Sequence, residues 1–156
     1  MVVFINGSIN SGKTTVGKLL AERLGFEFLD FDTISGSIDN FNLQKDIPKV
    51  FEIGIKTINE LIAGGKGVVA TFVIRYKDYE QIQKKVKDEP VFITLAPKLR
   101  VALTNRGTRE LTQWQKDRVK YHYKTGVPNP SFGKIIDNST ITPEETVDKI
   151  CEQLKH

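Results

Sequence analysis

A stretch near the N-terminus, Gly7-Ser-Ile-Asn-Ser-Gly-Lys-Thr-Thr15, satisfies the pattern G-x-x-x-x-G-K-[ST]. The apolar run 2–5 precedes it, and apolar residues follow it at helical spacing as far as Gly25. The backbone amides of such a strand-to-helix turn point at an anion, and the helix dipole favours negative charge there. The stretch therefore predicts a phosphate-binding loop rather than a glycine-rich turn that binds nothing.

The residues of this loop have separate expected tasks. Lys13 should reach the β- and γ-phosphates of ATP and act in catalysis, and the Thr14 hydroxyl is placed to hold Mg²⁺. ATP and Mg²⁺ are therefore the expected cofactors. We expect every residue of the loop to contribute to nucleotide binding: Gly7, Ser8, Ile9, Asn10, Ser11, Gly12, Lys13, Thr14 and Thr15.

Length and composition restrict the remaining possibilities. The 156 residues fit one compact domain over residues 1–156, and 39% hydrophobic with 27% charged residues is ordinary for a globular protein. The apolar runs are strand-sized, so no membrane span is expected, and the N-terminus already reads as a strand rather than a signal peptide. The single cysteine, Cys151, excludes an internal disulfide and favours a cytoplasmic location.

The charge pattern restricts which binding partners are expected. A net charge of +4 suits anionic ligands such as nucleotides, but basic and acidic residues are interleaved, so nucleic acid is not an expected partner. The expected partner is a small molecule that carries a hydroxyl group. Either a monomer or a homodimer is compatible with the sequence.

Strand-like and helical segments alternate along the chain. Strands are predicted at 2–5, 25–29, 68–74, 90–95 and 134–136, with helices between them and a final helix that begins at the capping box 142–145. Residues 33–45 have the composition of a loop, and the helix after Pro97 is expected to run through Arg106. This alternation predicts right-handed βαβ crossovers and an α/β domain with a parallel sheet of about five strands.

Two acidic residues end the second predicted strand. Asp30 and Asp32 are two positions apart, so on an extended segment they would face the same way. We expect Asp32 to act as the base that accepts the substrate hydroxyl proton and Asp30 to contact the metal. The spacing alone also permits the reverse assignment, or a pair of aspartates that only cap a loop.

Basic residues complete the expected site. Arg75 follows the strand at 68–74, at the end of the sheet where ligands bind, and is expected to contact the substrate. Arg106 and Arg109, one helical turn apart, are expected to contact the γ-phosphate and stabilise charge in the transition state. Alternatively, both are surface arginines paired with nearby acids. Asp137 is expected to begin a turn rather than orient adenine, and His122 to be a surface or lid residue.

With these residues identified, the chain resembles the small P-loop kinases around shikimate kinase, gluconate kinase and the chloramphenicol phosphotransferases. The resemblance rests on four segments: 7–15, 29–34, 106–109 and 137–145. It implies a single-domain P-loop NTPase three-layer sandwich with sheet order 2-3-1-4-5 and a helical lid at about 106–130. It also implies that Asp32 contacts the substrate hydroxyl, that Asp30 lies near magnesium, and that Arg106 or Arg109 is a lid arginine.

Two departures from this resemblance concern the acceptor. Shikimate kinases have an arginine in the helix after the substrate loop and a triple glycine, whereas residues 51–54 contain no arginine here and the strand at 68–74 ends in Ile74-Arg75. The departures favour an acceptor other than shikimate. The Arg-Gly-x-Arg lid and the Asp-Asn-Ser-Thr segment at 137–140 look more like the antibiotic phosphotransferases.

Taken together, these features predict an ATP-dependent small-molecule kinase that transfers the γ-phosphate to a substrate hydroxyl. Two alternatives stay open at this point. One is a nucleotide-binding ATPase or regulatory switch without an acceptor, and the other is a nucleoside or polynucleotide 5′-hydroxyl kinase, for which acceptor binding would depend steeply on salt.

Overall fold

The computed structural model describes residues 1–106 and 110–155 and contains one parallel sheet in the order β2-β3-β1-β4-β5. The central strand β1 pairs with β3 and β4, so that Val2 lies opposite both Val68 and Pro90. The predicted strand order is therefore confirmed. The strands are β1 (Val2–Gly7), β2 (Glu27–Asp30), β3 (Val68–Phe72), β4 (Pro90–Leu95) and β5 (Lys134–Ile136).

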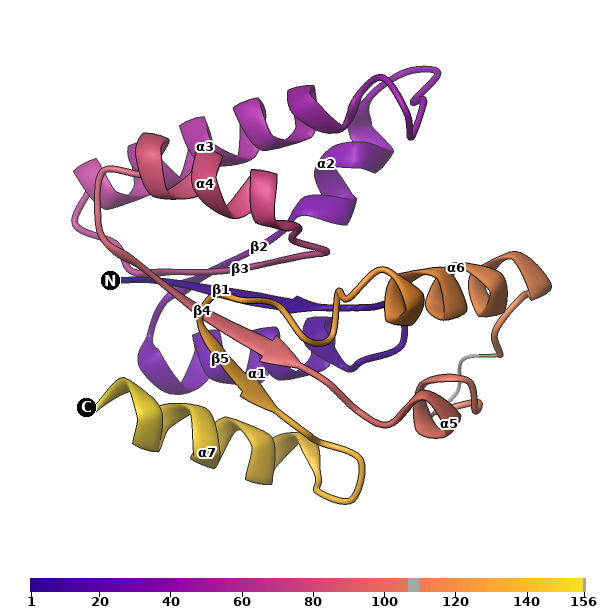
Figure 1. Cartoon of the computed structure of the whole chain (residues 1–156). Coiled ribbons are helices and arrows are strands. Elements are labelled where there is room, and N and C mark those ends of the chain that lie inside the picture. Colours follow the sequence, from indigo (N-terminus) through magenta and orange to yellow (C-terminus); the bar gives the residue numbers. More distant parts are fainter. Residues whose placement is uncertain (107–109, 156) are drawn as a thin grey trace.

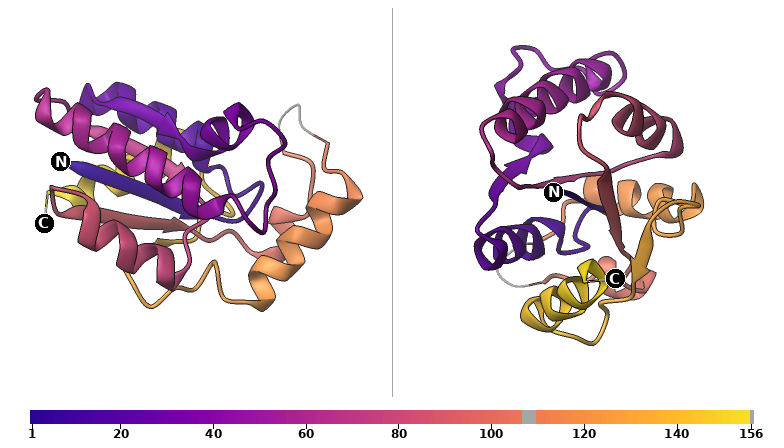
Figure 2. Two further views of the ribbon diagram at one scale, coloured as in Figure 1. Left: turned by 90° about the horizontal axis from the view of Figure 1, so that it is seen from above. Right: turned by 90° about the vertical axis from the view of Figure 1, so that its left-hand side faces the viewer.

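Helices cover both faces of this sheet. Figures 1 and 2 show α2, α3 and α4 on one face and α1 and α7 on the other, while α5 and α6 lie beyond the carboxyl ends of the strands. The arrangement is the expected three-layer sandwich. The helices are α1 (Lys13–Leu24), α2 (Phe31–Ser37), α3 (Ile47–Ala63), α4 (Tyr76–Lys85), α5 (Leu99–Ala102), α6 (Gln113–Lys124) and α7 (Pro143–Leu154).

Alternate residues of β1 enter separate hydrophobic cores. Val2 and Phe4 pack with residues of α3 and α4, whereas Val3 and Ile5 pack with residues of α1 and α7. All four side chains are fully buried. A central strand covered on both faces must be apolar throughout, which explains the uninterrupted run that precedes the phosphate-binding loop.

Phe31 fixes the position of α2 and therefore of the acidic residues around it. Its ring is fully buried and lies 5.5 Å from the ring of Phe51 on α3, centroid to centroid. It also packs so closely on Gly54 that a Cβ at this glycine would lie 2.3 Å from the ring. The absence of a side chain at Gly54 thus allows α2 and α3 to approach each other at the end of the sheet that carries the phosphate-binding loop.

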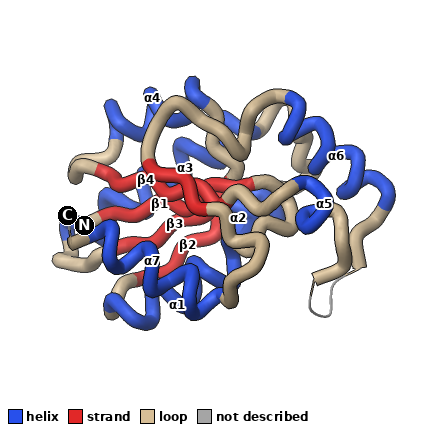
Figure 3. Tube along the Cα trace, turned by 60° about the horizontal axis from the view of Figure 1, so that its bottom comes forward, coloured by secondary structure: helices blue, strands red, loops and turns tan. Residues whose placement is uncertain are grey.

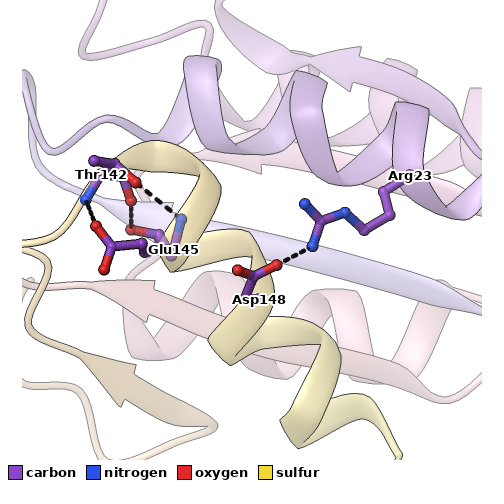
Figure 4. Close-up of polar contacts among 5 residues, drawn as sticks. Arg23, Thr142, Glu145 and Asp148 are labelled. Atoms are coloured by element: carbon purple, nitrogen blue, oxygen red, sulfur yellow. Dashed lines mark hydrogen bonds and ion pairs between the residues drawn. The ribbon is translucent and has the colours of Figure 1, made fainter.

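The predicted capping box at the start of α7 is present (Figure 4). The Thr142 side chain accepts a hydrogen bond from the Glu145 amide, and the Glu145 carboxylate accepts one from the Thr142 amide, both at 3.1 Å. Arg23 of α1 forms an ion pair with Asp148 of α7. The capping box stabilises the first turn of α7, and the ion pair joins α7 to α1 on the sheet face opposite α3.

Two sequence expectations were wrong. The helix after Pro97 is short and ends at Ala102, so Arg106 does not continue its face. The segment 33–45 is not entirely loop, because α2 extends to Ser37. Arg109 and His156 lie outside the described residues, and the lid boundaries at about 106–130 stay a prediction. Among the residues described, no helix is long and apolar enough to cross a membrane.

Candidate active site

The loop between β1 and α1 has the shape of an anion cradle. Gly12 adopts a left-handed φ of 92° and Asn10 one of 64°. A Cβ at Gly7 would lie 2.3 Å from Ser11 Oγ, so the loop can be this tight only with glycine at that position. Ser11 Oγ is itself buried without a hydrogen-bond partner within the described part of the chain. A close backbone turn that opens a helix fits the phosphates of ATP.

Lys13 spans the cradle. Its side chain is only 8% exposed, and Nζ donates a hydrogen bond to the Ser8 carbonyl at 3.2 Å. The ammonium group therefore lies across the loop from its own backbone position. A cation held there can meet phosphate oxygens that enter the loop.

Thr14 and Asp30 come together from different elements, α1 and β2. The Thr14 hydroxyl donates to Asp30 Oδ2 at 3.4 Å, so two oxygen ligands that suit Mg²⁺ lie side by side. The described residues contain no cluster of three or more His, Cys, Asp or Glu side chains. A magnesium ion at this position would be held by few protein oxygens, in the manner of ions that also bind substrate phosphates and water.

The spacing of Asp30 and Asp32 predicted that both lie on one extended segment, but they lie on different elements. Asp30 is the last residue of β2 and caps α2 by accepting a hydrogen bond from the Asp32 amide at 2.9 Å. Asp32 lies in the first helical turn and is exposed. The expected capping role is therefore real for Asp30, but the same carboxylate also reaches Thr14 with its second oxygen.

The tip of the phosphate-binding loop is bound to the end of α5 and to the residues that follow it. Asn10 Nδ2 donates to the carbonyls of Ala102 and Thr104, at 2.9 and 2.8 Å. Arg106 Nη1 donates to the Asn10 carbonyl at 2.9 Å. Arg106 therefore contacts the phosphate-binding loop from outside a helix, and its expected contact with the γ-phosphate stays a prediction. Arg109 falls in the part of the chain that is not described.

Asn138 is a site residue that sequence reasoning missed. Its side chain is 2% exposed, and Nδ2 donates to the Ser11 carbonyl at 2.9 Å, which joins the end of β5 to the phosphate-binding loop. A polar residue two positions after the end of the last strand was the available signal. The neighbouring Asp137 accepts a hydrogen bond from the Ser139 amide at 2.9 Å, which confirms that it begins a turn.

Arg75 is the N-cap residue of α4, the helix that Figure 3 shows beside the sheet. Its amide donates to the Asp78 carboxylate at 2.9 Å, while the preceding Ile74 amide donates to the buried Asn6 side chain at 2.7 Å. Asn6 is the residue before Gly7, so β1 itself fixes the backbone that leads into Arg75. The structure thus brings Arg75 to the neighbourhood of the phosphate-binding loop.

His122 of α6 is not a surface residue, contrary to one of the two expectations for it. It is 3% exposed, and its Nδ1 lies 2.8 Å from Ser8 Oγ. Burial lowers the pKa of His122 to about 4, and the positive charges of Arg118, Arg75 and Lys13 act in the same direction. The imidazole is therefore neutral at physiological pH.

Nearby on α6, burial raises the pKa of Tyr123 to about 12. The Tyr123 hydroxyl donates a hydrogen bond to the Pro97 carbonyl, in the loop that follows β4. The C-terminal part of α6 is therefore attached to the core through two consecutive side chains.

The sheet order, the cradle with Lys13 and the oxygen pair of Thr14 and Asp30 define a P-loop phosphotransferase. The chain belongs to the shikimate kinase family, whose family model matches residues 9–155. Among curated relatives, the shikimate kinase of Thermodesulfovibrio yellowstonii is 27% identical over 97% of this chain and 93% of its own length. The shikimate kinase of Vibrio vulnificus is also 27% identical, over 97% of this chain and 92% of its own.

Solved structures share the fold at low sequence identity. A shikimate kinase from Bacteroides thetaiotaomicron superposes with a TM-score of 0.68 at 16% identity, covering 100% of this chain and 99% of its own. A sugar kinase from Janibacter gives a TM-score of 0.74 at 15% identity, covering 99% and 94%. A gluconokinase from Sinorhizobium meliloti gives 0.69 at 16% identity, covering 99% and 95%.

These findings confirm the expected resemblance to the small P-loop kinases. The protein is an ATP-dependent kinase that phosphorylates a hydroxyl group of a small molecule. Membership in this family favours the kinase over a nucleotide switch that has no acceptor.

Proposed function

We propose that the acceptor is a small hydroxylated carboxylic acid of the shikimate type. The observation that carries this proposal is the match of the shikimate kinase family over residues 9–155, which includes the phosphate-binding loop from residue 9 onward, both aspartates and the segment 106–130. From the sequence alone, the departures at residues 51–54 and at Arg75 favoured an acceptor other than shikimate; given the family match, we interpret them as a difference in how the acid is held. One family arginine is absent from 51–54, but Arg75 introduces a cation at the end of β3.

Arg75 is the proposed partner of the acceptor carboxylate. It stands at the start of α4, and its charge acts on His122, which itself contacts the phosphate-binding loop at Ser8. A guanidinium can bind a carboxylate through two parallel hydrogen bonds, which would orient the ring of the acceptor. An acid held from this side would present its hydroxyl groups toward the loop.

Asp32 is the proposed base. Its exposed carboxylate lies in the first turn of α2, and the hydrogen bond from its amide to Asp30 places it next to the Thr14–Asp30 pair. It accepts the proton of the acceptor hydroxyl as the oxygen attacks the γ-phosphorus, and ADP leaves with the bonding electrons. Asp30 holds the loop and the metal region and is not needed as the base.

Lys13, Arg106 and Arg109 are the proposed cations of phosphoryl transfer. Lys13 exchanges its Ser8 carbonyl for phosphate oxygens, and Arg106 exchanges the Asn10 carbonyl for the γ-phosphate region. The Ser8 and Asn10 carbonyls are neutral backbone oxygens, and a negatively charged phosphate forms a stronger hydrogen bond with a cation than they do. Arg109 is included on its position in the Arg-Gly-Thr-Arg segment.

Mg²⁺ is the proposed metal, held by Thr14 and Asp30. An ion held by these two residues would supply positive charge that neutralises the charge developing in the transition state. The Thr14 hydroxyl and the Asp30 carboxylate supply the hard oxygen ligands that it prefers.

A second acceptor class has its own support. The Arg106–Arg109 segment and the Asp137–Thr140 segment resemble those of antibiotic phosphotransferases, which act on neutral hydroxylated molecules. This acceptor would not require a carboxylate partner. The two proposals therefore differ in what they expect of Arg75.

A coupled assay of ADP release in Mg²⁺-ATP separates them. Shikimate, related ring acids, sugars, nucleosides and phenicol antibiotics are supplied in turn to the wild type and to Arg75→Gln, with the exposed Arg100→Gln as the matched control. A shikimate-type acceptor predicts turnover with a ring acid and a raised acceptor KM in Arg75→Gln alone, with KM for ATP unchanged. Turnover with a neutral antibiotic, with the same acceptor KM in the wild type and in Arg75→Gln, contradicts the proposal.

A further inference from the structure

Ser8 makes two contacts, one through its backbone carbonyl and one through its side-chain hydroxyl, and the proposed reaction involves only the first. Its carbonyl accepts the hydrogen bond of Lys13 at 3.2 Å, and its hydroxyl lies 2.8 Å from Nδ1 of His122. Ser8 and His122 are 1% and 3% exposed, so neither polar group of the second contact has water as an alternative partner. Loss of one partner would leave the other buried and unsatisfied.

The contact fixes the C-terminal end of α6. The His122 carbonyl accepts a hydrogen bond from the Val127 amide at 3.0 Å, and the next residue, Tyr123, is bound to the Pro97 carbonyl. The opposite end of α6 is different in character, since Trp114 is 59% exposed. The helix is therefore anchored near His122, while its N-terminal end adjoins the lid segment.

The charges around His122 explain why a histidine can serve as this anchor. Cations face it from three elements: Arg118 on α6 itself, Arg75 at the start of α4 and Lys13 at the start of α1. A protonated imidazole would add a positive charge among them inside the fold. A neutral imidazole instead offers one acceptor and one donor, and it can pair with the Ser8 hydroxyl in either tautomer.

We propose that His122 is a positioning residue that couples α6 to the phosphate-binding loop through Ser8. The neutral side chain holds the second residue of the loop in the orientation that receives the nucleotide, and it anchors the C-terminal end of α6. Occupation of the loop by a nucleotide and the placement of α6 are thereby linked. The inference rests on the loop's role in nucleotide binding and not on the identity of the acceptor.

A pair of amide substitutions tests the contact atom by atom. In His122→Asn the amide lies near the position of Nδ1 and can still pair with Ser8, whereas in His122→Gln it lies near the position of Nε2. We expect Asn to retain MgADP affinity within about twofold and Gln and Leu to weaken it about tenfold, the size of one unsatisfied buried group. Calorimetric titration with MgADP measures this without any acceptor, and Lys120→Gln on the exposed face of α6 is the control.

Ser8→Ala examines the same contact from the other side. If the proposal holds, Ser8→Ala with His122→Leu is no weaker for MgADP than the worse single variant, because both remove one interaction. Hydrogen exchange of the α6 amides should accelerate in His122→Leu and in Ser8→Ala but not in Lys120→Gln. The proposal is contradicted if the fold-losses in MgADP affinity of the two single variants multiply in the double variant. It is also contradicted if His122→Asn and His122→Gln bind MgADP equally well.

The protonation state has an independent readout. The chain contains two histidines, so His156→Gln leaves the His122 imidazole as the sole histidine signal in ¹⁵N nuclear magnetic resonance. The proposal predicts a neutral ring at pH values well below 6.5, with titration near 4. Titration near the ordinary histidine value of about 6.5 would mean that the ring is not held as described and would overturn the proposal. This result, unlike kinase activity, does not depend on any substrate.

Discussion

Asn138 donates a hydrogen bond to the Ser11 carbonyl at 2.9 Å, although 127 residues separate the two in the sequence. The contact connects the end of β5 to the phosphate-binding loop, and Asn138 is almost completely buried. Together with Asn10 at the loop tip and His122 behind Ser8, it fixes the loop from three sides. The shape of the nucleotide site therefore depends on residues far outside the glycine-rich motif.

Asn138→Ala should weaken nucleotide binding and destabilise the fold. The substitution leaves the buried Ser11 carbonyl without its partner, a change of about 1–3 kcal/mol in the free energy of unfolding. Urea unfolding and calorimetric titration with MgADP measure the two effects. Asn129→Ala, at an exposed position in the segment after α6, is the matched control and should change neither quantity.

Lys13→Ala should abolish measurable ATP-dependent turnover. The ammonium group is the buried cation of the phosphate-binding loop, and loss of a preorganised donor at such a site typically lowers kcat by about 10²–10³. The comparison is with Lys84→Ala, which removes an exposed charge from the outer side of α4. Equal activity in the two variants would show that Lys13 does not act on the transferred phosphate.

Stability should depend on the protonation of His122. The folded pKa of about 4 lies below the ordinary 6.5, so between these pH values the unfolded chain binds more protons than the folded one. The contribution of His122 is fully present above the ordinary value, and stability falls as the pH is lowered toward 4. The slope from this group is at most about 1.4 kcal/mol per pH unit.

His122→Asn removes this titration and keeps a side chain that can pair with Ser8. The difference in unfolding free energy between wild type and variant should therefore change in favour of the variant as the pH falls from about 7 to about 5. Comparing the two proteins cancels the carboxylates that they share, among them Asp78, whose pKa is raised by burial. Parallel pH profiles would contradict the buried neutral state of His122.

Thr142→Ala should lower stability by about 1 kcal/mol, because the Thr142 hydroxyl caps the first turn of α7. For a chain of this length the expected fall in Tm is about 2–4 °C. Thr142→Ser retains the capping oxygen and should unfold close to the wild-type temperature. Since α7 packs against α1 and not against the acceptor side, ATP turnover should be unchanged in both variants.

Local sequence signals predicted the strands and the last helix well. The apolar residues of β4 and the capping box at Thr142–Glu145 act within their own segments, so the sequence pattern contains the information that decides them. The sheet order followed from the resemblance to the small P-loop kinases. The loop motif also predicted the strand-to-helix connection between β1 and α1, in which Lys13 and Thr14 open the helix.

The errors arose where distant residues decide the local structure. Asn10 draws the carbonyls of Ala102 and Thr104, which helps to explain why α5 ends at Ala102 and Arg106 leaves its helical face. Asp30 caps α2. This helix was not predicted, because the glycine and serine residues after Asp30 give the segment the composition of a loop. The burial of His122 depends on Ser8, 114 residues away, and no periodicity within α6 reveals that contact.

The chemical roles of the site residues are proposals, whereas the fold is observed. The contact between Thr14 and Asp30 brings together the two residues proposed for the metal, but the exposed Asp32 is assigned as base by resemblance and by its position beside them. The central claim is therefore that Asp32 receives the proton of the acceptor hydroxyl while the loop and the cations act on the phosphate.

The most direct measurement is ADP release by wild type and Asp32→Asn in Mg²⁺-ATP, with and without the acceptor found in the panel, alongside MgADP affinity. Asp39→Asn, which removes an exposed carboxylate after α2, is the control. The account predicts acceptor-dependent release in the wild type and the control, and loss of that release in Asp32→Asn with MgADP affinity retained. Full acceptor-dependent release by Asp32→Asn would contradict the assignment of Asp32 as the base.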